Sequence, residues 1–364
     1  MRHHVVGCLV CLGSVVARAQ TPAADSALKV SFGGFVDTYY AYDFRRPPTL
    51  DRALTTQAAR HNEFNVNLAF VDATLTGSRL RGRFAAQFGT SVQANYAGEP
   101  RLGVLSGPDV SRFIQEATAG YQVAPTLWID GGVFFSPFGS ENWISRDNWT
   151  YTRSLIAENS PYYEAGVKAT WQATPTIAAQ LHIINGWQNI SETNSDKAFG
   201  GRLDLTPKDA VAVSYDVFVG NEQPDSLPSR IRLWHEGVLQ LKPAGTVQLR
   251  ATFDLGSQER ASGGSSWWRG GALIARYQIN GHVAAAGRAE YYSDPDQVII
   301  STGHSYGVRV WGGSLNTDVA LTPRLLWRIE LRSLSAHDPL FPDRSSRGLA
   351  TTDPVCVTSL ALTF

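Results

Sequence analysis

The chain has 364 residues with 32 basic and 32 acidic side chains, so its formal net charge is zero. This balance gives no electrostatic case for binding nucleic acid, which requires a basic surface to neutralise phosphates. After residue 19, no stretch has the roughly 18 uninterrupted apolar residues of a membrane helix. Glycine and aromatic residues are nevertheless abundant, a composition that a β-rich protein can use.

The first residues have the pattern of an export signal. A short basic start is followed by an apolar stretch from 5 to 16 and by Ala17-Arg18-Ala19, a small-x-small sequence suited to signal peptidase. We predict a signal peptide over 1–19, cleaved after Ala19, and a single mature domain over 20–364.

Cleavage would leave one cysteine, Cys356, so the mature chain could form no internal disulfide. The pattern places Cys356 on the outer face of the last strand, where a small apolar filler is the simplest role.

Runs with period-two alternation recur throughout the mature chain. A clear example puts Leu325, Trp327, Ile329 and Leu331 on one face and Arg328, Glu330 and Arg332 on the other. About sixteen runs follow this pattern. They begin near residues 30, 63, 81, 113, 127, 162, 176, 198, 210, 229, 246, 267, 282, 312, 325 and 355.

The connections alternate between short turns and long polar loops. Thr174-Pro175 and Asn280-Gly281 are typical turns, whereas 135–161 and 335–354 are typical loops. Short turns on one rim and long loops on the other are characteristic of outer-membrane barrels. We therefore expect an all-β transmembrane antiparallel up-and-down β-barrel of about sixteen strands, with both mature chain ends on the periplasmic side.

The last strand carries an apolar stripe to a terminal aromatic residue. Leu360, Leu362 and Phe364 share one face, which makes sense where that face meets lipid and the strand closes the sheet. We interpret these three residues as a terminal-strand signal, with outer-membrane lipids and the outer-membrane assembly machinery as partners.

The opposite faces of the strands carry full charges, which cannot be left dry and unpaired. They therefore indicate a lumen wall with water or dense ion pairing, although structural pairing without a selective role remains an alternative for each. The predicted lumen-wall residues are Arg83, Asp130, Glu164, Lys168, Arg202, Asp204, Asp216, Arg250, Asp254, Arg288, Glu290, Arg328, Glu330 and Arg332.

The long loop 135–161 is rich in charge and aromatic residues and has a brief helical possibility at 155–158. Structureless stretches of this length are usually functional. We expect it to fold into the lumen and narrow it, the alternative being a lid packed over the mouth by Trp143 and Trp149. The residues expected to set its local field are Glu141, Arg146, Asp147, Arg153 and Glu158.

Motifs for enzymatic chemistry are missing from the sequence. There is no GxSxG, HExxH or P-loop, and no Cys/His metal cluster. His182 lies in a predicted strand without a neighbouring motif and is interpreted as a hydrogen-bonded lumen residue. We expect no catalytic residues, cofactor or metal.

Several segments resemble a known family, most specifically WISRDNWTYTRS at 143–154 together with GGFVDTYYAYDFRRP at 33–47 and QLHIINGWQNI at 180–190. They are similar to the outer-membrane β-barrel porin family labelled porin-2, OmpL-like, over roughly the first half of the mature chain. The resemblance implies an outer-membrane barrel that conducts small solutes, and it supplies no site residues.

Together these features predict an outer-membrane porin through which small hydrophilic solutes or ions diffuse passively. Two alternatives stay open, a loop-plugged barrel acting as a surface receptor or adhesion structure and, less favoured, an outer-membrane hydrolase. The sequence leaves open whether the barrel is a monomer or a homotrimer, and which solutes it prefers.

Overall fold

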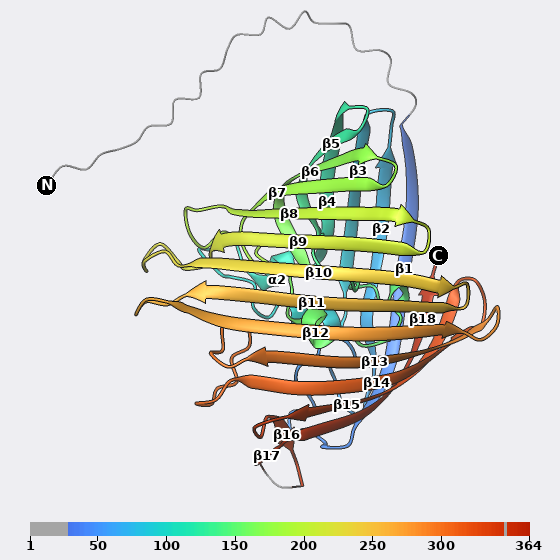
Figure 1. Ribbon diagram of the computed structural model, residues 1–364, viewed down its shortest axis with the longest axis vertical. Helices are drawn as coiled ribbons and strands as arrows, with labels where there is room; N and C mark the ends of the chain where they lie inside the picture. The colour runs from blue at the N-terminus through green and yellow to red at the C-terminus, as the bar shows by residue number, and fades with distance from the viewer. Residues whose placement is uncertain (1–27, 346–347) are drawn as a thin grey trace, which may run out of the picture.

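The computed structural model describes residues 28–345 and 348–364, and within them sixteen antiparallel strands form one closed barrel (Figure 1). Each strand pairs with its neighbours along the chain, and the last pairs with the first. The barrel strands are β1 (Lys29–Asp43), β2 (Phe64–Thr76), β3 (Leu80–Phe88), β4 (Ile114–Ala124), β5 (Leu127–Phe135), β6 (Tyr163–Thr174), β7 (Ile177–Ile184), β8 (Ala198–Lys208), β9 (Val211–Asn221), β10 (Ile231–Ala244), β11 (Val247–Glu259), β12 (Ser265–Gln278), β13 (Val283–Asp294), β14 (Val308–Ala320), β15 (Leu325–Ala336) and β18 (Thr352–Thr363).

The predicted architecture is confirmed. The largest error in a strand start is at β14, expected near residue 312 and observed from Val308. The signal peptide expected over 1–19 lies outside the described residues and stays a prediction. For the strands drawn horizontally in Figure 1, β8 to β13, the short turns lie at the right-hand end and the longer loops at the left-hand end.

One short hairpin was not predicted. β16 (Phe341–Asp343) pairs with β17 (Gly348–Ala350) inside the connection from β15 to β18, which the sequence pattern treats as a plain loop. Three-residue strands are too short to show a reliable alternation. Phe341 is almost completely buried in the largest hydrophobic cluster, so this contact holds the hairpin against the barrel.

The seam between β1 and β18 uses the very end of the chain. The Gly34 amide donates to the Phe364 carbonyl at 3.0 Å, and the Phe364 amide donates to the Gly34 carbonyl at 3.1 Å. A barrel in lipid must satisfy every backbone group internally, and these bonds complete the ring. The side chains of Leu360, Leu362 and Phe364 are exposed on the outside of the barrel.

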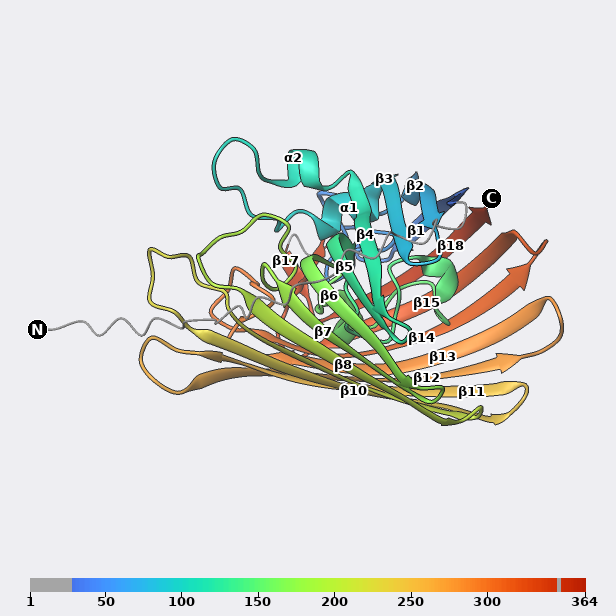
Figure 2. The same cartoon turned by 90° about the horizontal axis from the view of Figure 1, so that it is seen from above.

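The helical segments are short and lie in the loops. They are α1 (Thr90–Asn95), α2 (Pro108–Ser111), α3 (Leu155–Glu158) and a 3₁₀ turn (Ser145–Asp147). α3 occupies the segment for which the sequence predicts a brief helix. None of the helices in the described residues is long and apolar enough to cross a membrane. α1 contacts β2 and β3, and α3 contacts β12 and β13, so both lie within the ring of strands (Figure 2).

Candidate functional site: the barrel lumen

The wall of the barrel has its apolar side chains outside and its charged side chains inside. On β15, Trp327 is 39% exposed and Leu331 is 54% exposed, whereas Arg328 is 2% exposed and Glu330 is fully buried. A soluble protein has the opposite arrangement, because apolar burial drives its folding. An exposed apolar belt around a buried polar interior suits a barrel whose outside contacts lipid.

The structure places all fourteen predicted lumen-wall residues on the inner face of the barrel. In each strand they lie on the face whose residues are buried or contact the loops inside, and the residues on either side of them point outward. Their influence on which solutes enter stays a prediction. Some of them anchor a loop and are buried, whereas others keep contact with open space.

The first group anchors a loop. Residues 136–162, which connect β5 to β6, are called the inserted loop below. The backbone amide of Thr152 donates to Glu330 at 2.6 Å, and that of Leu155 donates to Glu290 at 2.6 Å. Arg288 lies between these carboxylates and donates to the Thr152 carbonyl at 2.5 Å. Charged wall residues therefore hold the backbone of the loop directly.

The inserted loop reaches down to the short-turn end of the barrel. Arg328 donates to the carbonyls of Ser145 and Asn148. Arg146 donates to the carbonyls of Arg324 at 2.8 Å and Pro323 at 2.5 Å, both in the turn between β14 and β15. These contacts rule out the alternative of a lid packed over the mouth, because the loop crosses the interior instead.

The two tryptophans expected to hold such a lid are also inside. The indole Nε1 of Trp143 donates to Ser91 Oγ at 2.8 Å, and the ring packs against Tyr96 and Tyr162. Trp149 lies under the guanidinium of Arg250, 4.3 Å from its carbon to the ring centre. The tryptophans thus pack the loop against the wall rather than close the entrance.

Most of the five charged loop residues expected to set a field are occupied in fixing the loop. Glu141 accepts from the Ser154 amide at 3.0 Å, and Arg146 caps the carbonyls already described. Arg153 donates to the Ala157 carbonyl and stacks 3.6 Å from the ring centre of Tyr162. Asp147 remains exposed. The charges of this loop thus act first as structural groups.

The fifth residue, Glu158, ties the inserted loop to the first long loop. Its carboxylate accepts from the Thr56 hydroxyl at 2.7 Å and from the Tyr162 hydroxyl at 2.6 Å. Burial raises the pKa of Tyr162 well above its usual range, so its hydroxyl stays a neutral donor. Loop 44–63 therefore enters the barrel beside the inserted loop.

Sequence reasoning missed Asp37, which is a main anchor of the loop. Its carboxylate accepts from Ser145 Oγ at 2.8 Å, from Tyr151 at 3.2 Å and from Asn67 at 2.8 Å. The signal was present, because Asp37 lies two residues from the inward-facing Phe35 and Tyr39 in β1. Its contacts with residues more than a hundred positions away could not be inferred from that alternation.

A second group of wall residues, Arg83 on β3 with Arg202 and Asp204 on β8, keeps contact with open space, whereas Asp130 and Glu164 on the strands between are buried. Arg83 forms ion pairs with Asp72, at 3.4 Å, and with Glu116, and its side chain is 24% exposed. Arg202 pairs with Asp204 at 2.9 Å, and both side chains remain partly exposed. By contrast, the side chains of Arg288, Glu290 and Glu330 are completely buried under the inserted loop.

The end of the lumen near the long loops is narrowed by an aromatic cluster. Phe134, Phe138, Phe218, Trp234, Trp268 and Tyr292 are all nearly inaccessible to solvent. Trp187, from the loop after β7, packs edge-on against Phe218 at 4.9 Å and against Trp234 at 5.4 Å. Beside this cluster a polar cavity of about 210 Å³ is bounded by the inserted loop and Arg202. The aromatic cluster and the inserted loop therefore fill part of the space that a sixteen-stranded wall encloses.

No arrangement for catalysis was identified in the described part of the chain. The Nε2 atom of His182 is 3.3 Å from Gln180, and its ring packs against Phe138 at 5.5 Å. Within the same residues, no group of three or more His, Cys, Asp or Glu side chains is placed to hold a metal ion.

Residues 29–364 match the model of the family described as putative beta-barrel porin-2, OmpL-like. The chain belongs to this family. It is an outer-membrane porin, and the resemblance noted in its first half extends over the whole barrel. No curated protein matches its sequence.

Solved structures share the fold of this porin. The anion-selective porin from Comamonas acidovorans aligns with a TM-score of 0.61 and 12% identity, over 93% of this chain and all of that chain. The outer-membrane channel DcaP of Acinetobacter baumannii aligns with a TM-score of 0.60 and 12% identity, over 93% of this chain and 97% of that chain. OmpT of Vibrio cholerae, in a trimer form, aligns with a TM-score of 0.58 and 9% identity, over 93% of this chain and all of that chain. At these identities the likeness concerns the fold alone.

The anchoring of the inserted loop can be tested by replacing Arg288 with methionine. Removing one partner from a buried ionic network costs about 3 to 5 kcal/mol, because the remaining carboxylates lose their counter-charge. We expect Arg288→Met to loosen the loop, so that trypsin cleaves after Arg153 faster than in the wild type, as measured by mass spectrometry of the fragments.

Arg309→Met is the matched control. Arg309 points outward from β14, so this substitution removes the same charge at a position away from the loop. Both variants should keep the heat-dependent gel mobility of a folded barrel. Equal cleavage rates at Arg153 in the wild type and in Arg288→Met would show that this arginine does not anchor the loop.

Proposed function

We propose that this porin is a narrow passive channel for small hydrophilic solutes or ions, restricted in width by its inserted loop. The supporting observation is the asymmetry of the wall. The loop is bonded most heavily to β13, β14, β15 and β1 and has further bonds to Arg202 on β8 and Asp216 on β9. Arg83, Asp72 and Glu116, on β2 to β4, stay partly exposed. Those exposed charges would line a water-filled path beside the loop.

Transport in this proposal needs no covalent step and no energy source. Solutes would be selected by the free width beside the loop and by the field of facing carboxylates and guanidiniums. Ion pairs such as Arg83 with Glu116 give that wall both signs of charge, so the field would act on local groups of a solute more than on its net charge. The protein would act as a shaped opening and not as an enzyme.

A plugged barrel that serves as a surface receptor is the second candidate, and the aromatic cluster favours it. Phe138 of the inserted loop contacts Phe218 and Trp234 on the wall, and this apolar packing excludes water from part of the lumen. The two candidates differ in one property, because only the channel leaves a continuous aqueous path.

Single-channel recording in planar bilayers separates them. We expect small, stable current steps in KCl for the wild type, and steps several-fold larger when residues 140–156 are replaced by a short Gly-Ser linker. The larger steps follow from removing the chain segment that occupies the interior. Arg309→Gln, which changes an outward-facing charge, should conduct like the wild type.

A folded wild-type protein that passes no current, beside a linker variant that conducts, would overturn the channel proposal in favour of the plugged barrel. If neither protein conducts although both fold, neither an open nor a loop-gated path exists.

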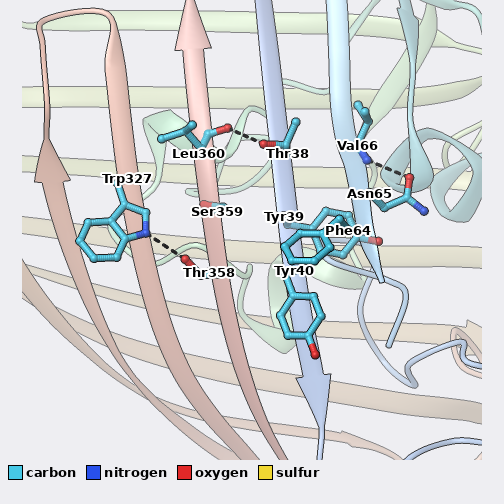
Figure 3. Close-up of a pocket in the computed structure, with 10 residues that line it drawn as sticks. All are labelled: Thr38, Tyr39, Tyr40, Phe64, Asn65, Val66, Trp327, Thr358, Ser359 and Leu360. Carbon is cyan, nitrogen blue, oxygen red and sulfur yellow. Dashed lines mark hydrogen bonds between the residues drawn. The ribbon is translucent and has the colours of Figure 1, made fainter. Parts of the chain in front are cut away.

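We further propose that the porin assembles as a homotrimer through the outer face of β15, β18, β1 and β2. A groove of about 600 Å³ lies on this face. Figure 3 shows Tyr40 and Phe64 on one side of it and Trp327 on the other. Several of its polar groups are already bonded, as in the 2.9 Å contact between Trp327 Nε1 and Thr358 Oγ1 and the bond from Thr38 Oγ1 to the Leu360 carbonyl. A groove lined mainly by aromatic and aliphatic side chains suits apolar packing against a second copy.

An apolar arm supports assembly independently. Residues 101–107 lead into α2 and project beside the barrel in Figure 2, and Val104 is 94% exposed, with Leu102 and Leu105 similarly open. Exposed apolar segments of this kind usually mark an interaction site. The likeness of the fold to the OmpT trimer form agrees with a symmetric assembly.

Cys356 offers a native probe for this assembly. It is a free cysteine on the outer face of β18, in register with Tyr42 and Leu331. We expect a nitroxide attached to Cys356 to give a single short distance between protomers by double electron–electron resonance. Moving the label to Leu273 on β12, in a Cys356→Ser background, should give a much longer distance. Absence of any intermolecular distance from either position would rule out the trimer.

A further inference from the structure

A second cavity, of about 420 Å³, opens at the short-turn end of the lumen. It lies between the inserted loop, from Arg146 to Trp149, and the inner faces of β12 to β15. Short turns of bacterial barrels face the periplasm, so this cavity is the inner vestibule of the porin. It is separate from the aromatic cluster and from the cavity beside Arg202.

The charges around this cavity are unequally compensated. Asp318 binds Arg328 at 2.9 Å, so these two groups neutralise each other. Asp147 forms no ion pair among the described residues, but its carboxylate interacts electrostatically with Arg146 and Arg328. The side chain of Arg276 reaches the cavity from β12, and no carboxylate partner for it was identified among the described residues. One guanidinium therefore faces the cavity without a counter-charge.

A second arginine, Arg250, forms no ion pair among the described residues and lies against the cavity lining, although Glu141 and Glu236 act on its charge. Arg250 is 8% exposed, and its Nε and Nη1 atoms have no hydrogen-bond partner in the described part of the chain. Its guanidinium lies over the ring of Trp149, which forms part of the cavity lining. Because Arg250 pairs in register with Ile274, it lies one inward position from Arg276 on the neighbouring strand.

We propose that this vestibule binds small oxyanions carrying a carboxylate or phosphate group, with Arg276 as the primary contact. The planar guanidinium matches the two oxygens of such a group, Arg250 adds positive potential, and the Trp149 ring offers an apolar surface to the rest of the molecule. As a statement of which solutes the channel favours, the proposal rests on the proposed diffusion function, whereas the binding itself does not.

Inorganic phosphate and acetate are suitable probes. With the full-length mature protein in octyl glucoside at constant ionic strength, we expect added protein to shorten the transverse relaxation time of the phosphate ³¹P signal. A matched experiment follows the acetate methyl protons. Arg276→Gln should weaken the affinity for both by about tenfold, since it removes a charge-assisted contact. Arg276→Lys should keep part of it.

Asp147→Asn should change the phosphate affinity in the opposite direction from Arg276→Gln. Removing the exposed carboxylate leaves Arg146 uncompensated as well, so we expect tighter phosphate binding than in the wild type. Arg309→Gln again controls for loss of a positive charge outside the lumen. All variants should retain the heat-dependent gel mobility of the folded barrel, so that a loss of binding is not confused with unfolding.

Equal relaxation in the wild type and in Arg276→Gln, or no effect of the wild type at all, would overturn the oxyanion site. Weaker binding in Asp147→Asn would do the same. Because these measurements need no ion current, a barrel that binds phosphate but does not conduct would refute the channel and keep the site. A barrel that conducts ions but does not bind phosphate would keep the channel and refute the oxyanion site.

Discussion

Every strand of this porin must present one face to hydrocarbon and the other to a polar interior. The outer face cannot hold unpaired charges, because lipid gives them no partner, whereas the inner face can hold both charged and aromatic side chains. The period-two alternation seen on β15 is the direct result. Ring closure through Gly34 and Phe364 follows from the same constraint, since lipid offers no partner for a free strand edge.

The interior charges then have two uses. On β13 to β15, they hold the inserted loop: Arg288 and Glu330 bind its backbone and have no contact with solvent. On β3 to β8, groups such as Arg83 and Asp204 pair with neighbours on the wall and stay partly exposed. The loop also contacts the opposite wall, where Arg202 donates to the carbonyls of Pro137 and Gly139. The proposed channel would therefore run past the partly exposed charges around Arg83.

The period-two alternation of apolar and polar residues was enough to predict most of the fold. It placed the strand starts to within a few residues and gave the inward orientation of all fourteen predicted wall residues, because both depend only on local spacing. The course of the inserted loop could not be obtained in this way. Its hydrogen bonds join residues far apart in sequence: Arg146 donates to the Pro323 carbonyl, and the Ser145 hydroxyl donates to the Asp37 carboxylate. Most of the loop charges form hydrogen bonds or contacts that hold the loop, and their predicted influence on which solutes pass stays a prediction.

The two-solvent wall can be tested directly by a nitroxide scan across β7 and β8 in a Cys356→Ser background. Labels at Leu181 and Leu203, which are exposed on the outside, should collide readily with oxygen dissolved in the bilayer. Labels at Gln180 and Asp204, on the inner face, should instead be reached by a water-soluble nickel chelate. If all four positions responded alike, the strands would not separate lipid from water, and the channel would lose its basis.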